Sequence, residues 1–246
     1  MKHIASCLVL LALCAAARAD EFDSDGVKIH YIDEGKGDPV VLVHGFASSI
    51  KMNWELPGVV GLLSKSYRVI ALDCRGFGQS DKPEGEANYG VKMVDDVVRL
   101  MDHLEVKKAH IVGYSMGGII AMKLVAAHAD RVTSVVLGGM GWLKAGGVLG
   151  KAFELMSGRG GAMPEGCFQS LGSLGVTEDE VKGIKVPLSM IVGDRDPCRL
   201  MYVQPLAKAR PDFDVTEIAD AGHITAIMKP EFKDDVKADL DKHAGK

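Results

Sequence analysis

The sequence predicts an α/β protein in which a mostly parallel sheet is covered by helices on both faces. Short apolar runs rich in β-branched residues alternate along the chain with longer helix-prone segments, which is the pattern of β-α-β units. One of these runs, residues 109–112, leads into a tight glycine-bounded turn and then into an Ala-rich helical segment. The length of 246 residues, with 47% hydrophobic and 25% charged residues, is ordinary for a globular protein of this class.

The first 19 residues have the composition of a secretory signal peptide. After a short polar start, residues 4–17 are nearly all apolar, and Ala17 and Ala19 supply the small residues of an A-x-A cleavage site. We therefore expect cleavage after Ala19, export to the periplasm or the medium, and a mature domain of residues 20–246.

An uncleaved membrane anchor is the alternative for this segment. The apolar run of residues 4–17 is shorter than the roughly 20 residues that span a bilayer, so we expect no stable membrane anchor. The net charge of −4 gives no reason to expect a nucleic-acid partner. The mature chain would keep Cys74, Cys167 and Cys198, and export permits one disulfide whose pair the sequence does not identify.

The first half of the chain contains four segments that we expect to form strands, of which all but the first are apolar runs. These are residues 27–32, 40–43, 69–72 and 109–112. A helix is expected over 52–63, broken or shifted by Pro57 and Gly58. A second helix is expected over 91–104, where apolar residues recur at i, i+3, i+4 and i+7.

The second half continues the alternation around one interruption. We expect strands over 132–137, 186–192 and 213–218, and helices over 119–127, 202–209 and 231–242. The interruption is residues 138–185, a Gly-rich and weakly helical stretch. We interpret it as an insertion between two strands of the same domain.

A serine lies between two glycines at the most informative turn of the chain. Gly113-Tyr114-Ser115-Met116-Gly117 joins an apolar strand to a helix-prone run. A turn this tight forces unusual backbone angles on the serine and requires neighbours without side chains. Ser115 would then expose its hydroxyl at a helix N-terminus, where backbone N–H groups favour negative charge. This pattern predicts a nucleophile.

The candidate base is His223, because it follows the last expected strand at the same sheet edge as Ser115. Histidines 103, 110 and 128 are expected at the surface. The acid that orients the base would be Asp194 or Asp196, since both follow the strand that ends near Val192. Arg195 is expected to pair with Asp194 at the surface.

An oxyanion hole needs two backbone N–H donors beside the nucleophile. Met116 supplies the first, because it directly follows Ser115. The loop that begins at His44-Gly45-Phe46 supplies the second, which we assign to Phe46. His44 itself is interpreted as a structural residue that holds this loop.

The chain resembles α/β-hydrolase-fold proteins of the serine esterase and perhydrolase type. The resemblance rests on "VVLVHGF", "YRVIALDCRGFGQS", "IVGYSMGG", "IVGDRDP" and "AGH", in family order. It implies Ser115 as nucleophile, His223 as base and Asp196 as acid, because the family pattern counts three residues from Gly193. It also implies that residues 138–185 form a cap. The serine distinguishes the chain from dehalogenases and epoxide hydrolases, which have aspartate there.

The sequence thus predicts a serine hydrolase that cleaves a small carboxylic ester through an acyl-enzyme. Perhydrolysis, thioester cleavage and C–C bond hydrolysis are alternatives on the same triad. A non-catalytic ligand-binding protein is the alternative from another class, although a binder would have no need of the complete triad. The mechanism requires no metal and no organic cofactor, and the sequence leaves the oligomeric state open.

Overall fold

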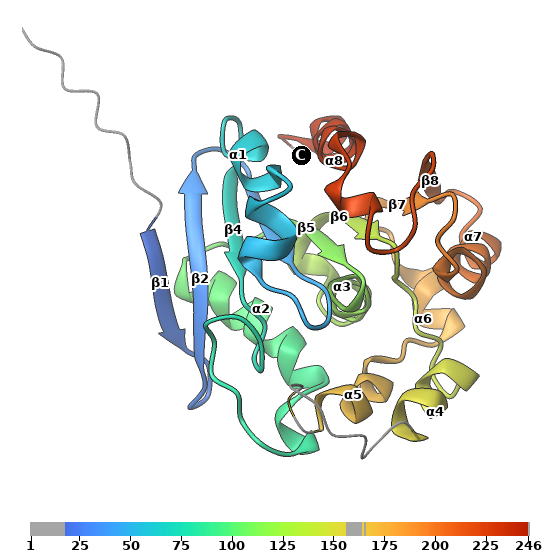
Figure 1. Cartoon of the computed structure of the whole chain (residues 1–246), viewed down its shortest axis with the longest axis horizontal. Coiled ribbons are helices and arrows are strands. Elements are labelled where there is room, and N and C mark those ends of the chain that lie inside the picture. Colours follow the sequence, from blue (N-terminus) through green and yellow to red (C-terminus); the bar gives the residue numbers. More distant parts are fainter. Residues whose placement is uncertain (1–17, 156–163, 165, 246) are drawn as a thin grey trace, which may run out of the picture.

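The computed structural model describes residues 18–155, 164 and 166–245, and it contains one eight-stranded sheet in the order β1-β2-β4-β3-β5-β6-β7-β8 (Figure 1). The strands are β1 (Arg18–Asp23), β2 (Lys28–Gly35), β3 (Pro39–Val43), β4 (Arg68–Leu72), β5 (Ala109–Tyr114), β6 (Val132–Gly138), β7 (Leu188–Gly193) and β8 (Asp214–Ile218). All neighbouring pairs from β4 to β8 are parallel, whereas β2 is antiparallel to both β1 and β4. The predicted fold class is confirmed.

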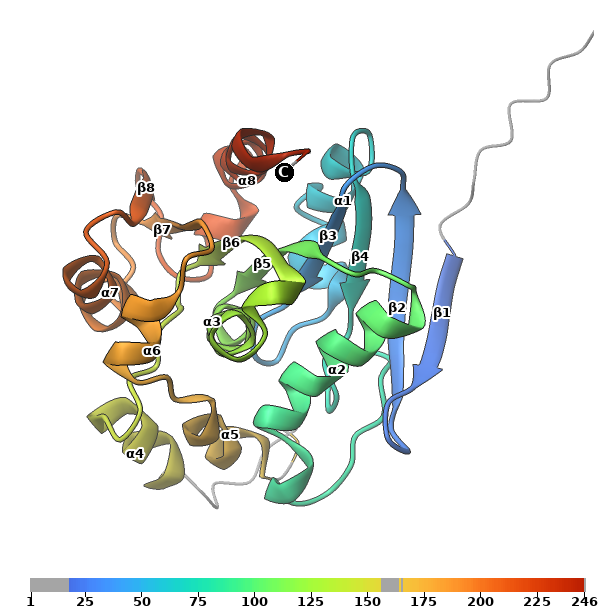
Figure 2. The ribbon, with the colours of Figure 1, turned by 180° about the vertical axis from the view of Figure 1, so that it is seen from behind.

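Helices cover the sheet on both faces. Helices α1 (Val59–Leu63) and α8 (Pro230–His243) pack together on one face (Figure 1), and α2 (Val91–His103) and α3 (Met116–Ala127) lie on the other (Figure 2). The remaining helical segments are η1 (Lys51–Glu55), η2 (Glu86–Asn88), η3 (Ala129–Arg131), α4 (Val148–Leu155), α5 (Cys167–Ser170), η4 (Leu171–Leu174), α6 (Glu178–Gly183), η5 (Arg199–Val203), α7 (Gln204–Ala209) and η6 (Ala226–Met228). The helix expected over 52–63 is split into η1 and α1, as Pro57 and Gly58 predict.

The apolar strands supply two cores because successive side chains point to opposite faces. Val41 and Val43 of β3 join the core under α2 and α3, whereas Val40 and Leu42 join the core under α1 and α8. All four side chains are fully buried. The continuous apolar run in β3 is therefore explained by burial on both faces, as expected for a central parallel strand.

The first strand differs from the prediction. No strand was expected before residue 27, yet β1 pairs with β2 from Arg18 to Asp23. Its sequence is polar because it forms the edge of the sheet, so it lacks the apolar signal of the inner strands. Residues 1–17 of the expected signal peptide lie outside the described residues, and the expected cleavage after Ala19 falls within β1.

The described residues of the segment 138–185 form helices α4, α5 and α6; α4 and α5 lie beyond the carboxyl ends of the parallel strands (Figure 1), and α6 leads into β7. The Phe168 ring of this segment lies 5.2 Å from the ring of Phe46, centroid to centroid. The Gly-rich residues 158–161 lie outside the described part. Among the residues with a described structure, no helix combines the length and apolar character needed to cross a membrane.

Candidate active site

Ser115 occupies a strained turn between β5 and α3. Its backbone angles are φ 54° and ψ −117°, a region that side-chain-bearing residues rarely adopt. A Cβ on Gly113 would lie 2.2 Å from the carbonyl oxygen of Gly117, and a Cβ on Gly117 would lie 2.0 Å from that of Val43. Any side chain at either position would therefore clash with the backbone, so both positions require glycine. The backbone N–H of Ser115 donates to Gly138 O at 2.7 Å, which holds the turn against β6.

The structure brings Ser115, His223 and Asp196 together in one hydrogen-bonded chain. His223 Nε2 lies 2.9 Å from Ser115 Oγ, and His223 Nδ1 lies 2.7 Å from Asp196 Oδ2. A carboxylate only accepts, so Nδ1–H donates to Asp196 and Nε2 is left to accept the serine proton. The side chain of His223 is 24% exposed, whereas that of Asp196 is fully buried.

Asp196 remains ionised despite its burial. Burial opposes ionisation, but hydrogen bonds from the His223 ring and from the Cys198 backbone N–H (2.8 Å) outweigh it and lower the pKa of Asp196. Asp194 lies elsewhere, and its carboxylate accepts the backbone N–H of Ala221 at 3.1 Å. The expected pair between Arg195 and Asp194 is wrong, because the Arg195 guanidinium pairs with Asp220, across the loop that leads to His223.

Two residues to which the sequence analysis gave no role, Tyr114 and Gly139, contact His223. The Tyr114 hydroxyl donates to the carbonyl oxygen of His223 at 2.5 Å. Burial raises the pKa of Tyr114, so the phenol keeps the proton that it donates. Gly139 passes so close to the ring that a Cβ there would lie 2.9 Å from His223 Cε1. Neither residue has a local sequence signal, because each acts through a contact distant in sequence.

The two residues expected to supply oxyanion donors lie on the segments that flank Ser115. Met116 is the first residue of α3, directly after Ser115. Phe46 lies in the loop after β3, next to Gly45, whose added Cβ would be 3.1 Å from Ser115 Cβ. The Gly45 N–H is fixed by Asn53 Oδ1 at 2.8 Å. The loop therefore approaches the serine with its backbone.

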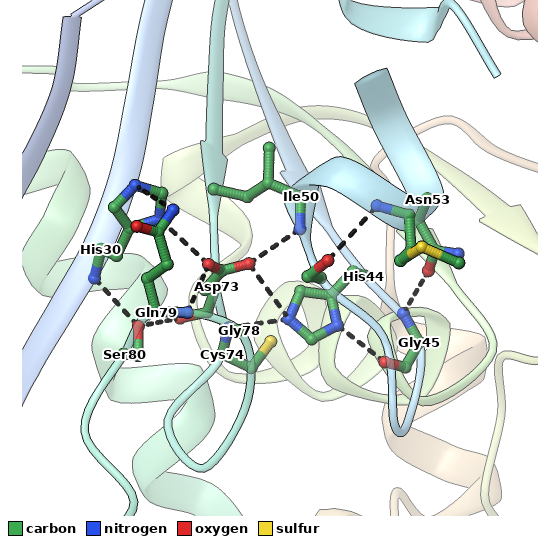
Figure 3. Close-up of polar contacts among 12 residues, drawn as sticks. His30, His44, Gly45, Ile50, Asn53, Asp73, Cys74, Gly78, Gln79 and Ser80 are labelled. Atoms are coloured by element: carbon green, nitrogen blue, oxygen red, sulfur yellow. Dashed lines mark hydrogen bonds and ion pairs between the residues drawn. The ribbon is translucent and has the colours of Figure 1, made fainter. Parts of the chain in front are cut away.

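His44 holds this loop, which confirms its structural interpretation. His44 Nδ1 donates to Gly45 O at 2.7 Å, and its Nε2 accepts the Cys74 N–H at 2.9 Å (Figure 3). Full burial lowers the pKa of His44 and keeps the ring neutral, which suits one donor and one acceptor nitrogen. The ring thereby ties the loop after β3 to the loop after β4.

Asp73 is the centre of a buried network that the sequence analysis did not identify. Its carboxylate accepts the Ile50 N–H at 2.7 Å and the Gln79 N–H at 2.9 Å, and it lies 3.0 Å from His30 Nδ1 (Figure 3). A Cβ on Gly78 would lie 2.1 Å from the Asp73 carboxyl carbon, so the loop can close over the acid only with glycine. Asp73 therefore fixes the loops after β3 and β4, at the edge of the sheet that carries Ser115.

A pocket of about 360 Å³ opens beside Ser115, between the loop after β3 and the His223 loop. Its lining includes Ser115 and His223, and its apolar side chains include Met52, Ile224 and Met228. These three are 54%, 81% and 53% exposed, so they form an apolar rim at the mouth. No Lys, Arg, Asp or Glu belongs to the described lining.

The hydrogen-bonded arrangement of Ser115, His223 and Asp196, the elbow and the sheet agree with the comparison with known families. The family described as the alpha/beta hydrolase fold matches residues 38–178, more than half of the chain. The chain belongs to the α/β-hydrolase fold family. The serine elbow and the loop of His44 both lie within the matched region.

Individual relatives of this α/β hydrolase differ in chemistry. The chain is 39% identical over 122 residues to 2-hydroxymuconate semialdehyde hydrolase of Pseudomonas sp. (strain CF600), covering 48% of this chain and 42% of the relative. It superposes on the meta-cleavage product hydrolase from Pseudomonas fluorescens IP01 with a TM-score of 0.73 and 25% identity, covering 91% and 97% of the two chains. A thermophilic esterase from Thermogutta terrifontis gives a TM-score of 0.78 at 24% identity, covering 93% and 100%.

These similarities establish the fold and the family rather than one reaction. The match spans less than half the length of the curated relative, and the esterase likeness, at 24% identity, shows the fold alone. The reaction must therefore be argued from the site.

Proposed function

We propose that this α/β hydrolase is a serine hydrolase that cleaves small, uncharged carboxylic esters through an acyl-enzyme. The observation that carries the proposal is the continuous chain Ser115–His223–Asp196, with distances of 2.9 and 2.7 Å. This arrangement gives the serine a base, and gives the base an ionised, buried acid that fixes its tautomer.

The mechanism follows from the positions of the protons. His223 Nε2 takes the Ser115 proton while Ser115 Oγ attacks the ester carbonyl carbon, and the N–H groups of Phe46 and Met116 hold the oxyanion. The imidazolium then protonates the leaving alcohol, and Asp196 stabilises its charge. Water activated by His223 releases the acid and restores the serine.

The pocket favours an ester over the acidic substrates of C–C hydrolases. The curated relative is named for 2-hydroxymuconate semialdehyde, which carries a carboxylate. The described lining beside Ser115 offers no Lys or Arg to pair with such a group, and its rim is apolar. An unpaired carboxylate in this pocket would lose hydration without compensation, whereas a neutral ester would not.

The test is hydrolysis of p-nitrophenyl acetate by the purified protein, before and after a serine-directed organophosphate. Ser115→Ala serves as the control and should lose about 10⁴-fold or more in kcat, the scale of triad deletions. Parallel assays with a thioester, with peroxide as acyl acceptor and with a meta-cleavage dienoate separate the related reactions. Faster turnover of the dienoate than of any ester, or near-normal turnover by Ser115→Ala, would overturn the proposal.

We propose in addition that the protein is exported by cleavage after Ala19. The apolar run and the A-x-A site support this, and cleavage there would leave Asp20–Asp23 of β1 paired with β2. N-terminal sequencing of the protein recovered from the periplasm or the medium tests the proposal. An N-terminus upstream of the apolar run would contradict it.

A further inference from the structure

Two residues of the proposed triad, Asp196 and His223, also belong to a group of three side chains that could bind a metal ion. Asp196, Cys198 and His223 each offer one ligand atom, and the three atoms lie within 4.8 Å of one another. In the part of the chain that the structure describes, no other His, Cys, Asp or Glu side chains form a group of this kind. The catalytic mechanism uses the first and the last of these side chains but has no role for the thiol.

The local backbone explains why the thiol is there. Cys198 lies two residues after Asp196, and the two are joined by a turn. The backbone N–H of Cys198 donates to Asp196 Oδ1 at 2.8 Å. Asp196 and Cys198 are only 3% and 4% exposed, so the thiol and the carboxylate share a buried position. His223 reaches the same carboxylate from the loop after β8.

We propose that Asp196, Cys198 and His223 form an inhibitory site for a soft divalent cation such as Zn²⁺. One sulfur, one imidazole nitrogen and one carboxylate oxygen form a donor set that zinc accepts, whereas Mg²⁺ and Ca²⁺ require oxygen ligands. Zinc bonds of about 2.0–2.3 Å place tetrahedral ligands farther apart than 2.7 Å. Entry of the ion must therefore open the contact between His223 Nδ1 and Asp196 Oδ2 and draw the sulfur inward.

The proton balance explains why the bound ion inhibits. Bonds form from the cation to Nδ1, Sγ and a carboxylate oxygen, while the Nδ1–H and Sγ–H bonds break. The thiol proton passes to solvent, and the imidazole takes its own proton at Nε2 instead. An Nε2–H group cannot accept the Ser115 proton, so the nucleophile is no longer activated.

The route to the site is the open side of the histidine. His223, with 24% of its side chain exposed, lines the pocket beside Ser115, whereas the other two ligands are enclosed. The ion therefore enters past the exposed edge of His223 and binds behind the ring, on the side of Asp196 and Cys198. Inhibition rests on the proposed hydrolase function, but binding of the cation does not.

The first experiment measures binding without activity. Co²⁺ is added to the full-length protein as a spectroscopic substitute for zinc, and a thiolate-to-cobalt charge-transfer band is expected in the wild type. Cys198→Ser should lose this band, whereas Cys167→Ser, which removes a buried thiol outside the cluster, should keep it. No band in the wild type, or an equal band in Cys198→Ser, would overturn the proposal whatever the catalytic activity.

The second experiment measures inhibition by Zn²⁺ with p-nitrophenyl acetate, relative to the metal-free rate of each variant. Loss of one ligand should raise the half-inhibiting concentration of Zn²⁺ in Cys198→Ser by about tenfold or more, while Cys167→Ser stays near the wild type. Mg²⁺ at the same concentrations should not inhibit. Equal zinc sensitivity of Cys198→Ser and the wild type would show that the ion acts elsewhere and would overturn the proposal.

Discussion

Asp194 and Asp196 follow the same strand two residues apart, and only Asp196 contacts His223. We expect Asp196→Asn to lower kcat by about 10⁴-fold with little change in KM, because an amide no longer fixes the Nδ1–H tautomer. Asp194→Asn should have a far smaller effect, since its amide oxygen can still accept the Ala221 N–H. Steady-state kinetics of the two variants check this, and the reverse ranking would assign the acid to Asp194.

At the scale of elements, the loops after β3 and β4 depend on one buried carboxylate. Asp73→Asn should destabilise the protein by about 1–3 kcal/mol. The amide NH₂ of asparagine would replace one carboxylate oxygen, so a donor would face a backbone N–H that is itself a donor. We expect kcat to fall as well, since the Phe46 loop is attached to this network through the Ile50 N–H. Urea unfolding and kcat are the measurements, and wild-type values for both would contradict the role assigned to Asp73.

Two of the four aspartates of helix α8, Asp239 and Asp241, lie in opposite environments. Burial raises the pKa of Asp239, whereas hydrogen bonds from Lys237 and Tyr67 lower that of Asp241. The pKa of an aspartate in the unfolded chain is about 3.9. A carboxyl whose pKa is higher in the folded state lowers the free energy of unfolding as the pH rises from the unfolded pKa through the folded pKa, and this loss remains at higher pH. Asp239→Asn should therefore raise Tm at pH 7, and this gain should shrink as the pH falls toward 4.

Asp241→Asn is the matched control on the same helix. Its lowered pKa contributes stability above the unfolded value, so this substitution should lower Tm at pH 7. Thermal melts of both variants across this pH range test the pair, and a loss of stability in Asp239→Asn at neutral pH would contradict the assignment.

At the scale of the whole molecule, local patterns predicted the parallel sheet and the serine elbow. The central strands are buried on both faces, and both elbow positions require glycine because an added Cβ would lie 2.0–2.2 Å from a backbone oxygen. The sequence did not predict β1 or the antiparallel direction of β2. Both depend on pairing with a neighbouring strand, and the polar sequence of β1 gives no local sign of that pairing.

Contacts between distant residues also explain what the sequence did not predict in the site. His110 was expected at the surface, yet it is buried in β5 with its Nδ1 2.7 Å from Ser134 Oγ. The choice of Asp196 over Asp194 depended on family resemblance, because both end the same strand. Tyr114 and Asp73 act through partners that no spacing in the sequence connects to them.

The size of the pocket beside Ser115 and its exposed apolar rim determine which acyl chain lengths we expect the protein to accept. A pocket of about 360 Å³ is at the small end for ligand sites. Each substrate methylene buried there stabilises the bound state by about 0.8 kcal/mol, which is roughly fourfold in kcat/KM. A methylene that extends past the rim of Met52, Ile224 and Met228 stays in water and adds nothing. We expect kcat/KM for p-nitrophenyl esters to change by no more than about fourfold per methylene from acetate to butyrate and to stop rising for longer chains. A steady rise up to long-chain esters, with a rate increase at the onset of micelle formation, would show that the exposed rim serves a lipid surface instead.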